Sequence, residues 1–348
     1  MAPPVSGFKL NANGVPDFDA LPLRAEIHDS PHAQAQGETF FQRDALHRQL
    51  IDKAPRIIND DVWTFNSQVS TQWDGLRHFA YQDAQKFYNG VEQGDIHHVD
   101  EHTGERSTVL GIQAWAEQGI VGRGVLVDYH GWRASPEGQT QSKVKEYDSF
   151  ESVSIPLEDL QACLKAQGTE LKFGDILFIR SGFMVSLATK TKDELATYRA
   201  VVPHHFGGVE QSEDMLRWIW DHFAAVAGDQ PSFECWPTKE SLLLHEVLLA
   251  GWGCPIGELF DLEKLAEHCR EQNRWTFFKR LQEANGSGDI SNTCPLIDTP
   301  RVVTYAFSPP FGSVMEVDPD KAVSPIRSHD ERTRAIGSDP NDGAGRLR

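Results

Sequence analysis

Polar and apolar side chains alternate along one segment of this chain, Asn66-Ser67-Gln68-Val69-Ser70-Thr71-Gln72-Trp73-Asp74-Gly75-Leu76-Arg77-His78. This period of two predicts a strand that runs into a turn at Gly75. The polar face of the strand would carry Gln68, Ser70, Gln72 and Asp74, and Trp73 would take the opposite face. A polar row of this kind is costly inside an apolar core but suits the wall of a polar pocket. His78 follows Asp74 by four residues and can return to the same pocket.

A second pair of ionisable residues lies far along the chain. His245 begins a mostly apolar segment, and Glu258 follows a glycine-rich turn ahead of a predicted helix. A carboxylate near the start of a helix is favoured by the helix dipole whether or not it is catalytic. The residues alone therefore leave His245 and Glu258 open between a structural and a functional role.

Strands and helices are mixed along the chain, which predicts an α/β or α+β class. Short apolar runs predict buried strands at 124–128, 175–180 and 301–307. Apolar stripes predict helices at 157–164, 215–223 and 259–266, and Ser212 is a predicted N-cap. We expect an extended lead-in over 1–22, one domain over 23–317 and a loosely packed tail over 318–348.

The composition excludes several classes of protein. The chain has 348 residues and a formal net charge of −18, which disfavours binding to nucleic acid or to an anionic membrane surface. Its five cysteines form no C-x-x-C pair, so we expect buried free thiols. No signal peptide or membrane span is visible, which predicts a cytoplasmic protein.

The polar segment resembles the signature of the cyclase family, H-x-G-T-H-x-D-x-x-x-H, a family that includes kynurenine formamidase and isatin hydrolase. The matching positions here are Gln68, Ser70, Thr71, Gln72, Asp74 and His78, and the family's downstream histidine and glutamate match His245 and Glu258. Segments 122–128, 174–182 and 226–232 resemble further motifs of the family, and the similarity runs from about Asn59 to Phe278. The resemblance implies a swivelling β/α cyclase-like fold, with a mixed sheet or barrel-like core flanked by helices, in a homodimer or homotetramer.

The chain departs from the signature at two positions. Gln68 and Gln72 stand where the family's hydrolases have metal-binding histidines. A neutral amide oxygen is a poorer ligand than imidazole for zinc or manganese, so a binuclear site is not expected. Asp74, His245 and Glu258 could still hold one divalent ion, Zn²⁺ or Mn²⁺, or the site could work with no metal. The family's N-terminal motif is not visible before Pro55, so residues 20–57 would shorten or replace one wall of the pocket.

The resemblance implies an enzyme that acts on a small carbonyl compound, with His78, Asp74, His245 and Glu258 as catalytic residues. The first alternative is hydrolytic opening of an amide, lactam or lactone, with His78 as the proton-transfer group. The second is a metal-independent cyclase, dehydratase or isomerase that uses histidine and aspartate as acid and base on a polyketide-like substrate. The third is a relative that only binds a small molecule. In each, the predicted substrate-binding residues are Gln68, Ser70, Gln72 and Trp73.

Overall fold

The structure is a computed structural model that describes residues 40–44, 47–64, 66–113, 115, 120–281 and 291–293. The chain divides into two units, Met1–Phe307 and Ser308–Arg348, and every described residue belongs to the first. The predicted lead-in, the tail and the predicted strand at 301–307 lie outside the described residues. The predicted limits 1–22, 23–317 and 318–348 therefore stay predictions.

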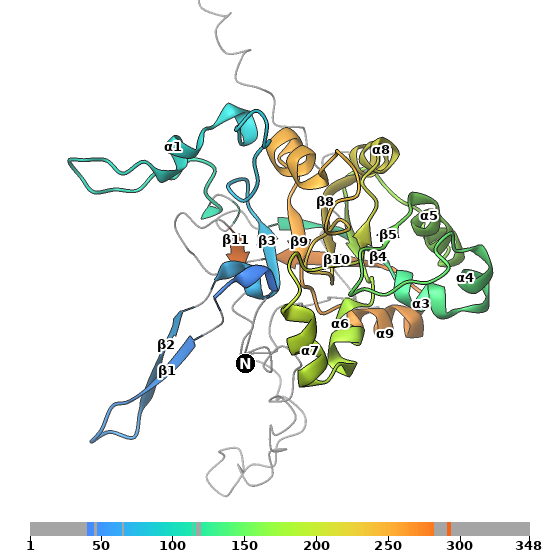
Figure 1. Cartoon of the computed structure of the whole chain (residues 1–348), viewed down its shortest axis with the longest axis horizontal. Helices are drawn as coiled ribbons and strands as arrows, with labels where there is room; N and C mark the ends of the chain where they lie inside the picture. Colours follow the sequence, from blue (N-terminus) through green and yellow to red (C-terminus); the bar gives the residue numbers. More distant parts are fainter. Residues whose placement is uncertain are drawn as a thin grey trace, which may run out of the picture. The chain divides into compact units, whose positions relative to one another are not determined.

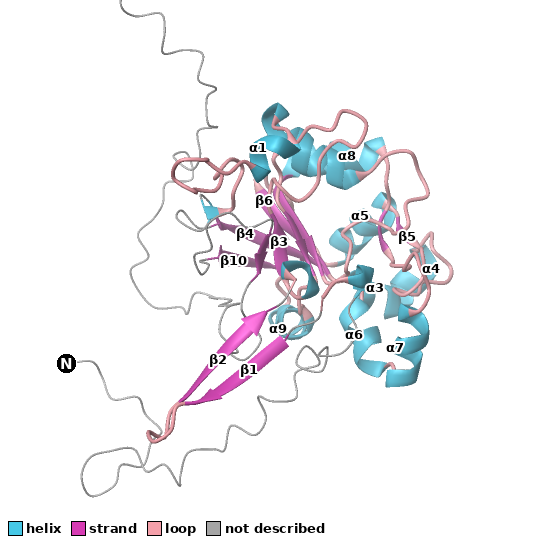
Figure 2. Cartoon of the chain, turned by 60° about the vertical axis from the view of Figure 1, so that its left-hand side comes forward, coloured by secondary structure: helices cyan, strands magenta, loops and turns pink. Residues whose placement is uncertain are grey.

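Within the described residues, seven strands form one mixed sheet (Figures 1 and 2). In spatial order they are β10 (Thr276–Leu281), β4 (Ile120–Val127), β6 (Asp175–Ile179), β8 (Phe223–Gly228), β9 (Ile256–Glu258), β3 (Gln72–Asp74) and β11 (Ser291–Thr293). The four strands β4, β6, β8 and β9 are parallel, while β10, β3 and β11 pair antiparallel to their neighbours. The sheet confirms the predicted α/β class with a mixed sheet, and β4 and β6 confirm the two predicted strands within the described residues.

Both faces of the parallel strands are buried, as their continuous apolar runs require. Because side chains alternate, Val125 and Val127 of β4 pack on one face, against α5 (Leu157–Ala166), α8 (Glu213–His222) and the π-helical turn η7 (Glu246–Trp252). Leu126 packs on the other face with α9 (Glu263–Gln272). The sheet therefore has a helical layer on each side.

The remaining elements are short. Two further pairs of strands are β1 (His47–Asp52) with β2 (Asn59–Thr64), antiparallel, and β5 (Ser154–Ile155) with β7 (Gly208–Val209), parallel. The other helices are α1 (Gln93–His97), α3 (Tyr129–Ala134), α4 (Pro136–Gln141), α6 (Phe183–Thr189) and α7 (Lys192–Arg199), with 3-10 turns η4 (Phe40–Gln42), η5 (Ser67–Val69) and η6 (Tyr88–Gly90). None of the helices within the described ranges is long and apolar enough to cross a membrane.

Helix boundaries follow local capping chemistry. The Ser212 side chain accepts a hydrogen bond from the backbone N–H of Met215, which confirms the predicted N-cap of α8. Helix α5 confirms the predicted helix at 157–164. The helix predicted at 259–266 begins later, at Glu263, because Leu259 has a left-handed backbone with φ 56° and belongs to the turn after β9.

The predicted strand over the polar segment is shorter than expected. The Asn66 side chain accepts a hydrogen bond from the backbone N–H of Gln68 at 2.9 Å and caps the 3-10 turn η5. The chain becomes extended at Ser70, and ladder pairing is confined to β3. Gln68 is therefore outside the strand, and its side chain reaches the polar face from a turn.

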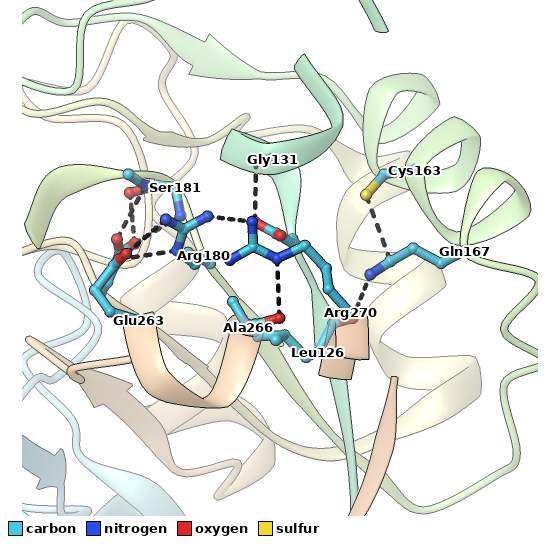
Figure 3. A network of polar contacts seen from close by, with 12 residues as sticks. Leu126, Gly131, Cys163, Gln167, Arg180, Ser181, Glu263, Ala266 and Arg270 are labelled. Carbon is cyan, nitrogen blue, oxygen red and sulfur yellow. Dashed lines mark hydrogen bonds and ion pairs between the residues drawn. The ribbon is translucent and has the colours of Figure 1, made fainter. Parts of the chain in front are cut away.

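An ionic group, which we call the Arg180 network, joins the buried Arg180 and Asp128 to the partly exposed Glu263 where β4 and β6 end (Figure 3). Arg180 is thus an ion-pair partner of both carboxylates. Nearby, Asp229 accepts hydrogen bonds from Ser181 Oγ and from the backbone N–H groups of Ser181 and Gly182, as expected of a residue that braces a strand end. Four cysteines of the described region, Cys163, Cys235, Cys254 and Cys269, are buried free thiols.

Candidate active site

Strand pairing brings the two distant polar segments together. Strand β3 lies antiparallel to β9, and the register places Gln72 directly opposite Glu258. Residues 186 positions apart in the sequence thus become neighbours, with Gln72 Nε2 3.1 Å from Glu258 Oε2. Asp74, His78, His245 and Glu258 gather at this point, and we call these four residues the acid–histidine cluster.

Two glutamine amides connect the carboxylates of the cluster. Gln68 Nε2 donates to Asp74 Oδ1 at 2.5 Å, and Gln72 Nε2 donates to Gln68 Oε1 at 3.1 Å as well as to Glu258. Glu258 Oε1 also accepts a hydrogen bond from the backbone N–H of Phe233 at 3.0 Å. The glutamines therefore turn their nitrogen atoms toward the acids, which is the arrangement of hydrogen-bond donors and not of metal ligands.

Glu234 fixes the orientation of His245. Glu234 Oε1 lies 2.7 Å from His245 Nδ1 and accepts the His245 backbone N–H at 2.8 Å. Its other oxygen accepts from the backbone of Leu244 and from Gln211 Nε2. With Nδ1 held by this buried carboxylate, His245 presents Nε2 to the cluster, 3.2 Å from Glu258 Oε1 and 3.9 Å from Asp74 Oδ2.

The second oxygen of Asp74 lacks a hydrogen-bond partner. Asp74 is fully buried, and its Oδ2 atom has no donor among the described residues. Nε2 of His78 lies 3.9 Å from this oxygen, the same distance as Nε2 of His245. One carboxylate oxygen and two imidazole nitrogens therefore surround a common point, all three within 4.8 Å of one another.

Burial and neighbouring charges shift the pKa values of the cluster in different directions. Burial raises the pKa of Asp74, against the opposing effect of His78. Burial lowers the pKa of His78, and the positive charges of His245 and Arg43 lower it further. Burial alone would lower the pKa of His245, but hydrogen bonds to Glu234 and Glu258 raise it well above the ordinary value. His78 is therefore a neutral base near pH 7, whereas His245 is a cation when it holds no other partner.

The structure joins six of the eight predicted site residues by direct contacts, all except Ser70 and Trp73. Ser70 is partly buried, and its Oγ atom has no partner among the described residues. Trp73 is not part of the cluster. It lies on the other face of β3, 2% exposed, with ring contacts to Phe178 and Phe260 in the apolar core.

Two residues near the cluster are not marked by any sequence pattern, Glu234 and Arg43. Arg43 follows η4 and donates from Nη1 to the backbone oxygen of Gln68 at 2.9 Å. Burial lowers its pKa, while the charges of Glu258 and Asp74 raise it, so its guanidinium lies within the field of both acids. Neither residue belongs to the polar segment, and only the folded chain brings them near it.

The acid–histidine cluster fits one divalent ion. A carboxylate and imidazole nitrogens are ligands that zinc and manganese accept. The orphaned Asp74 Oδ2 atom supplies a donor that nothing else in the described chain uses. His245 also has the outer carboxylate, Glu234, that usually orients a metal-binding imidazole.

Comparisons with known proteins agree with this architecture. A family model described as "Putative cyclase" matches residues 21–235, so the similarity begins well before Asn59 and includes most of residues 20–57. Among solved structures, one described as a novel cyclase has 29% identity and a TM-score of 0.60, and covers 74% of this chain and 82% of its own.

Two more distant structures also match. Isatin hydrolase A from Ralstonia solanacearum has 11% identity and a TM-score of 0.45, with 73% of this chain and 81% of its own covered. A structure from Bacillus stearothermophilus, described as a predicted metal-dependent hydrolase, has 14% identity and a TM-score of 0.36. The match covers 74% of this chain and 90% of that chain. The comparison with curated proteins finds no match.

Proposed function

Because this chain belongs to the cyclase family, we propose that it is a hydrolase that opens an amide, lactam or lactone at the acid–histidine cluster. The observation that carries the proposal is the buried Asp74 Oδ2 atom, which has no hydrogen-bond partner among the described residues and faces two imidazole nitrogens at 3.9 Å. A buried carboxylate oxygen without a donor is costly, and a bound cation removes that cost.

Asp74 and His245 would hold one divalent ion, with Glu258 as the adjoining carboxylate. When bound, such an ion polarises a substrate carbonyl and makes water more acidic. Glu234 would keep His245 in the tautomer whose Nε2 is free to bind. Gln68 and Gln72 would hold the two acids in place through the amide hydrogen bonds described above.

His78 would transfer the proton. It is the more exposed of the two imidazoles, with 18% of its side chain accessible against 10% for His245. It lacks a carboxylate on Nδ1 within the described region, which separates it from the ligand-like His245. Its lowered pKa keeps it neutral, so Nε2 can take a proton from the attacking water. The same proton would then pass to the leaving nitrogen or oxygen as the acyl bond breaks.

One observation favours a second candidate, a metal-independent lyase, cyclase or isomerase. His245 Nε2 lies 3.2 Å from Glu258 Oε1, so this pair forms a complete acid–base unit without an ion. In that case His78 would abstract a proton next to a carbonyl. In both candidates the partner is a small molecule, and a homodimer or homotetramer remains the expected assembly.

The test separates metal binding from proton transfer. Purified wild-type protein, His78→Gln and His245→Gln are assayed for bound zinc and manganese and for turnover of an amide, lactam and lactone panel. His245→Gln should lose both the ion and activity. His78→Gln should keep the ion and lose about 100- to 10,000-fold in kcat. His98→Gln, at a solvent-exposed position, is the matched control.

Three outcomes would contradict parts of this proposal. Full activity of His78→Gln would remove the proton-transfer role. Activity that survives chelation but depends on His78 would favour the lyase. Absence of turnover in a metal-loaded protein, with every class of substrate in the panel, would overturn the hydrolase.

A further inference from the structure

Every polar group of Gln68 has a hydrogen-bond partner. Its backbone N–H donates to Asn66 Oδ1, its side-chain oxygen accepts from Gln72, and its side-chain nitrogen donates to Asp74 Oδ1. These three partners belong to the polar segment, but the fourth does not. The backbone oxygen of Gln68 accepts from Nη1 of Arg43, 25 positions earlier in the chain, at 2.9 Å. The turn that carries the Gln68 amide to Asp74 is therefore held from outside by Arg43.

The four residues Phe40–Arg43, which we call the anchor segment, are fixed in an aromatic cluster. The backbone N–H of Phe41 donates to Nδ1 of His204 at 3.1 Å, and the Cζ atom of Arg43 lies 4.6 Å from the centre of the Phe41 ring. The rings of Phe40 and Phe41 contact those of Phe183, Tyr198, His204, Phe206 and Trp236. The guanidinium thus starts from a rigid base.

The backbone of the anchor segment is strained at Phe41. This residue has φ 57° and ψ 25°, a left-handed conformation that is unfavourable for a bulky side chain. Such a conformation persists only where the surrounding contacts hold it, and it occurs preferentially at functional sites. The aromatic contacts and the His204 hydrogen bond therefore set the path of the chain that leads to Arg43, two residues later.

We propose that Arg43 is a positioning residue, which holds the Gln68 turn so that the Gln68 amide fixes the Asp74 carboxylate. This inference rests on the proposed function and adds a residue to it. With Oδ1 of Asp74 held by the amide, Oδ2 stays directed at the Nε2 atoms of His78 and His245, each 3.9 Å away. Displacement of a reacting group by about 1 Å can lower a rate about 100-fold, so a contact outside the cluster can control turnover.

A direct effect of the Arg43 charge is the competing role, since the guanidinium lies within the field of Asp74 and Glu258. The observations favour positioning, because Arg43 donates to the backbone oxygen of Gln68, and the amide of Gln68 already donates to Asp74. The two roles can be separated by experiment. An effect of charge persists when the Gln68 side chain is removed, whereas an effect of position through that side chain does not.

The first test needs neither a metal nor a substrate. The glutamine side chains of metal-free protein are labelled with ¹⁵N, and the Gln68 amide signal is assigned by its loss in Gln68→Leu. A short hydrogen bond to a carboxylate moves an amide proton downfield, so this signal should lie downfield in wild type and move upfield in Arg43→Met. Arg133→Met is the matched control and should leave it unchanged, because Arg133 also donates to a backbone oxygen, that of Val144, and also lies over aromatic rings.

The second test is a double-mutant cycle on kcat and KM, with the amide, lactam or lactone that wild type hydrolyses. Arg43→Met and Gln68→Leu should each lower kcat about tenfold and change KM less than about twofold. The double variant should lose no more than Gln68→Leu alone, because Arg43 acts through the Gln68 side chain. Arg43→Lys, which keeps a donor, should keep most of kcat, and Arg133→Met should keep all of it.

An unchanged Gln68 signal in Arg43→Met would overturn the inference. Losses of kcat that add in the double variant would also overturn it, since Arg43 would then act by its charge. Arg43→Gln, whose side chain is shorter, takes the place of Arg43→Met if that variant does not fold. A moved signal in a protein that hydrolyses no substrate of the panel would contradict the proposed function and leave the positioning of Asp74 standing.

Discussion

The Arg180 network and the acid–histidine cluster are both largely buried and rich in charge, but they differ in how completely their atoms are paired. In the network, Arg180 donates to Asp128 Oδ1 at 2.6 Å and to both oxygens of Glu263 at 2.6 and 2.8 Å (Figure 3). Asp128 Oδ1 also accepts from the backbone N–H of Gly131. One cation thus meets two carboxylates, and each of the three guanidinium nitrogens has a carboxylate oxygen as its partner.

The acid–histidine cluster keeps part of its hydrogen-bonding capacity unused. Its two carboxylates face neutral amides and imidazoles, and Asp74 Oδ2 and Gln72 Oε1 stay unpartnered within the described residues. A network whose members are all satisfied holds a fold together, whereas buried polar atoms without partners are a cost that a ligand can remove. We infer from this difference that the network is structural, whereas the unpartnered atoms of the cluster agree with the proposed role in binding and chemistry.

The largest expected effect comes from Asp74→Asn. We expect kcat/KM to fall about 1,000-fold, within the range for loss of a catalytic group. The free energy of unfolding should change by less than about 1 kcal/mol or rise, because the variant removes a buried charge whose pKa is raised. Steady-state kinetics and urea unfolding measure the two effects. A large loss of stability with normal kinetics would show that Asp74 is a structural residue and not a catalytic one.

Arg180→Met should give the opposite result. Removal of the cation leaves the buried Asp128 carboxylate uncompensated, whereas Glu263, with 35% of its side chain exposed, can be solvated by water. We expect a loss of about 3 kcal/mol in the free energy of unfolding, while the folded fraction keeps its kcat. Chemical denaturation with activity normalised to folded protein checks this. An intact stability would show that the network is dispensable.

A pH effect is expected at Asp229, which lies beside the Arg180 network. Burial raises the pKa of Asp229 to about 6, against 3.8 ordinarily, so the folded protein holds this proton more tightly than the unfolded chain does. The stability that Asp229 contributes is therefore present below pH 3.8 and is lost as the pH rises through about 6. From pH 4 to pH 7 the unfolding free energy of wild type should fall by about 2 kcal/mol relative to that of Asp229→Asn. Urea unfolding at both values measures it, and a difference that stays constant would show that Asp229 is ionised throughout.

The smallest expected effect concerns Glu234→Gln. This change keeps the size of the side chain but weakens its hold on His245 Nδ1, so we expect zinc affinity to fall about tenfold. Glu210→Gln is a matched control, because Glu210 also accepts a backbone N–H, that of Leu157, away from the cluster. Calorimetric titration with zinc compares the two. Equal affinities in both variants would make Glu234 a purely structural residue.

Much of the fold could be predicted because its signals are local. The strands β4 and β6 follow from short apolar runs, and α8 follows from its stripe and from Ser212 at the N-cap. The prediction of a strand at the start of the polar segment was wrong, because the Asn66 side chain accepts a hydrogen bond from the backbone N–H of Gln68 and the chain turns there. A side chain that bonds to the backbone in this way competes with strand pairing. The alternation of polar and apolar residues in the sequence is the same in both cases, so it does not reveal the turn.

The four residues of the acid–histidine cluster could be predicted from the sequence, whereas the residues that position them could not. The resemblance to the cyclase family identified Asp74, His78, His245 and Glu258, because these residues match positions of the family's motifs in the sequence. Glu234 and Arg43 could not be found in this way. Glu234 acts through a contact with His245 eleven residues later, and Arg43 reaches the Gln68 backbone from outside the segment. Their roles depend on tertiary approach, which no local period encodes.

The most direct test of the account asks whether the acid–histidine cluster binds a metal ion. Wild type and Asp74→Asn are treated with a chelator and reloaded with zinc or manganese, and the number of ions per chain is measured. We expect about one ion per wild-type chain and none in Asp74→Asn, since the cluster offers a single set of ligands. Wild-type protein that takes up no ion, or a variant that holds as much as wild type, would contradict the account.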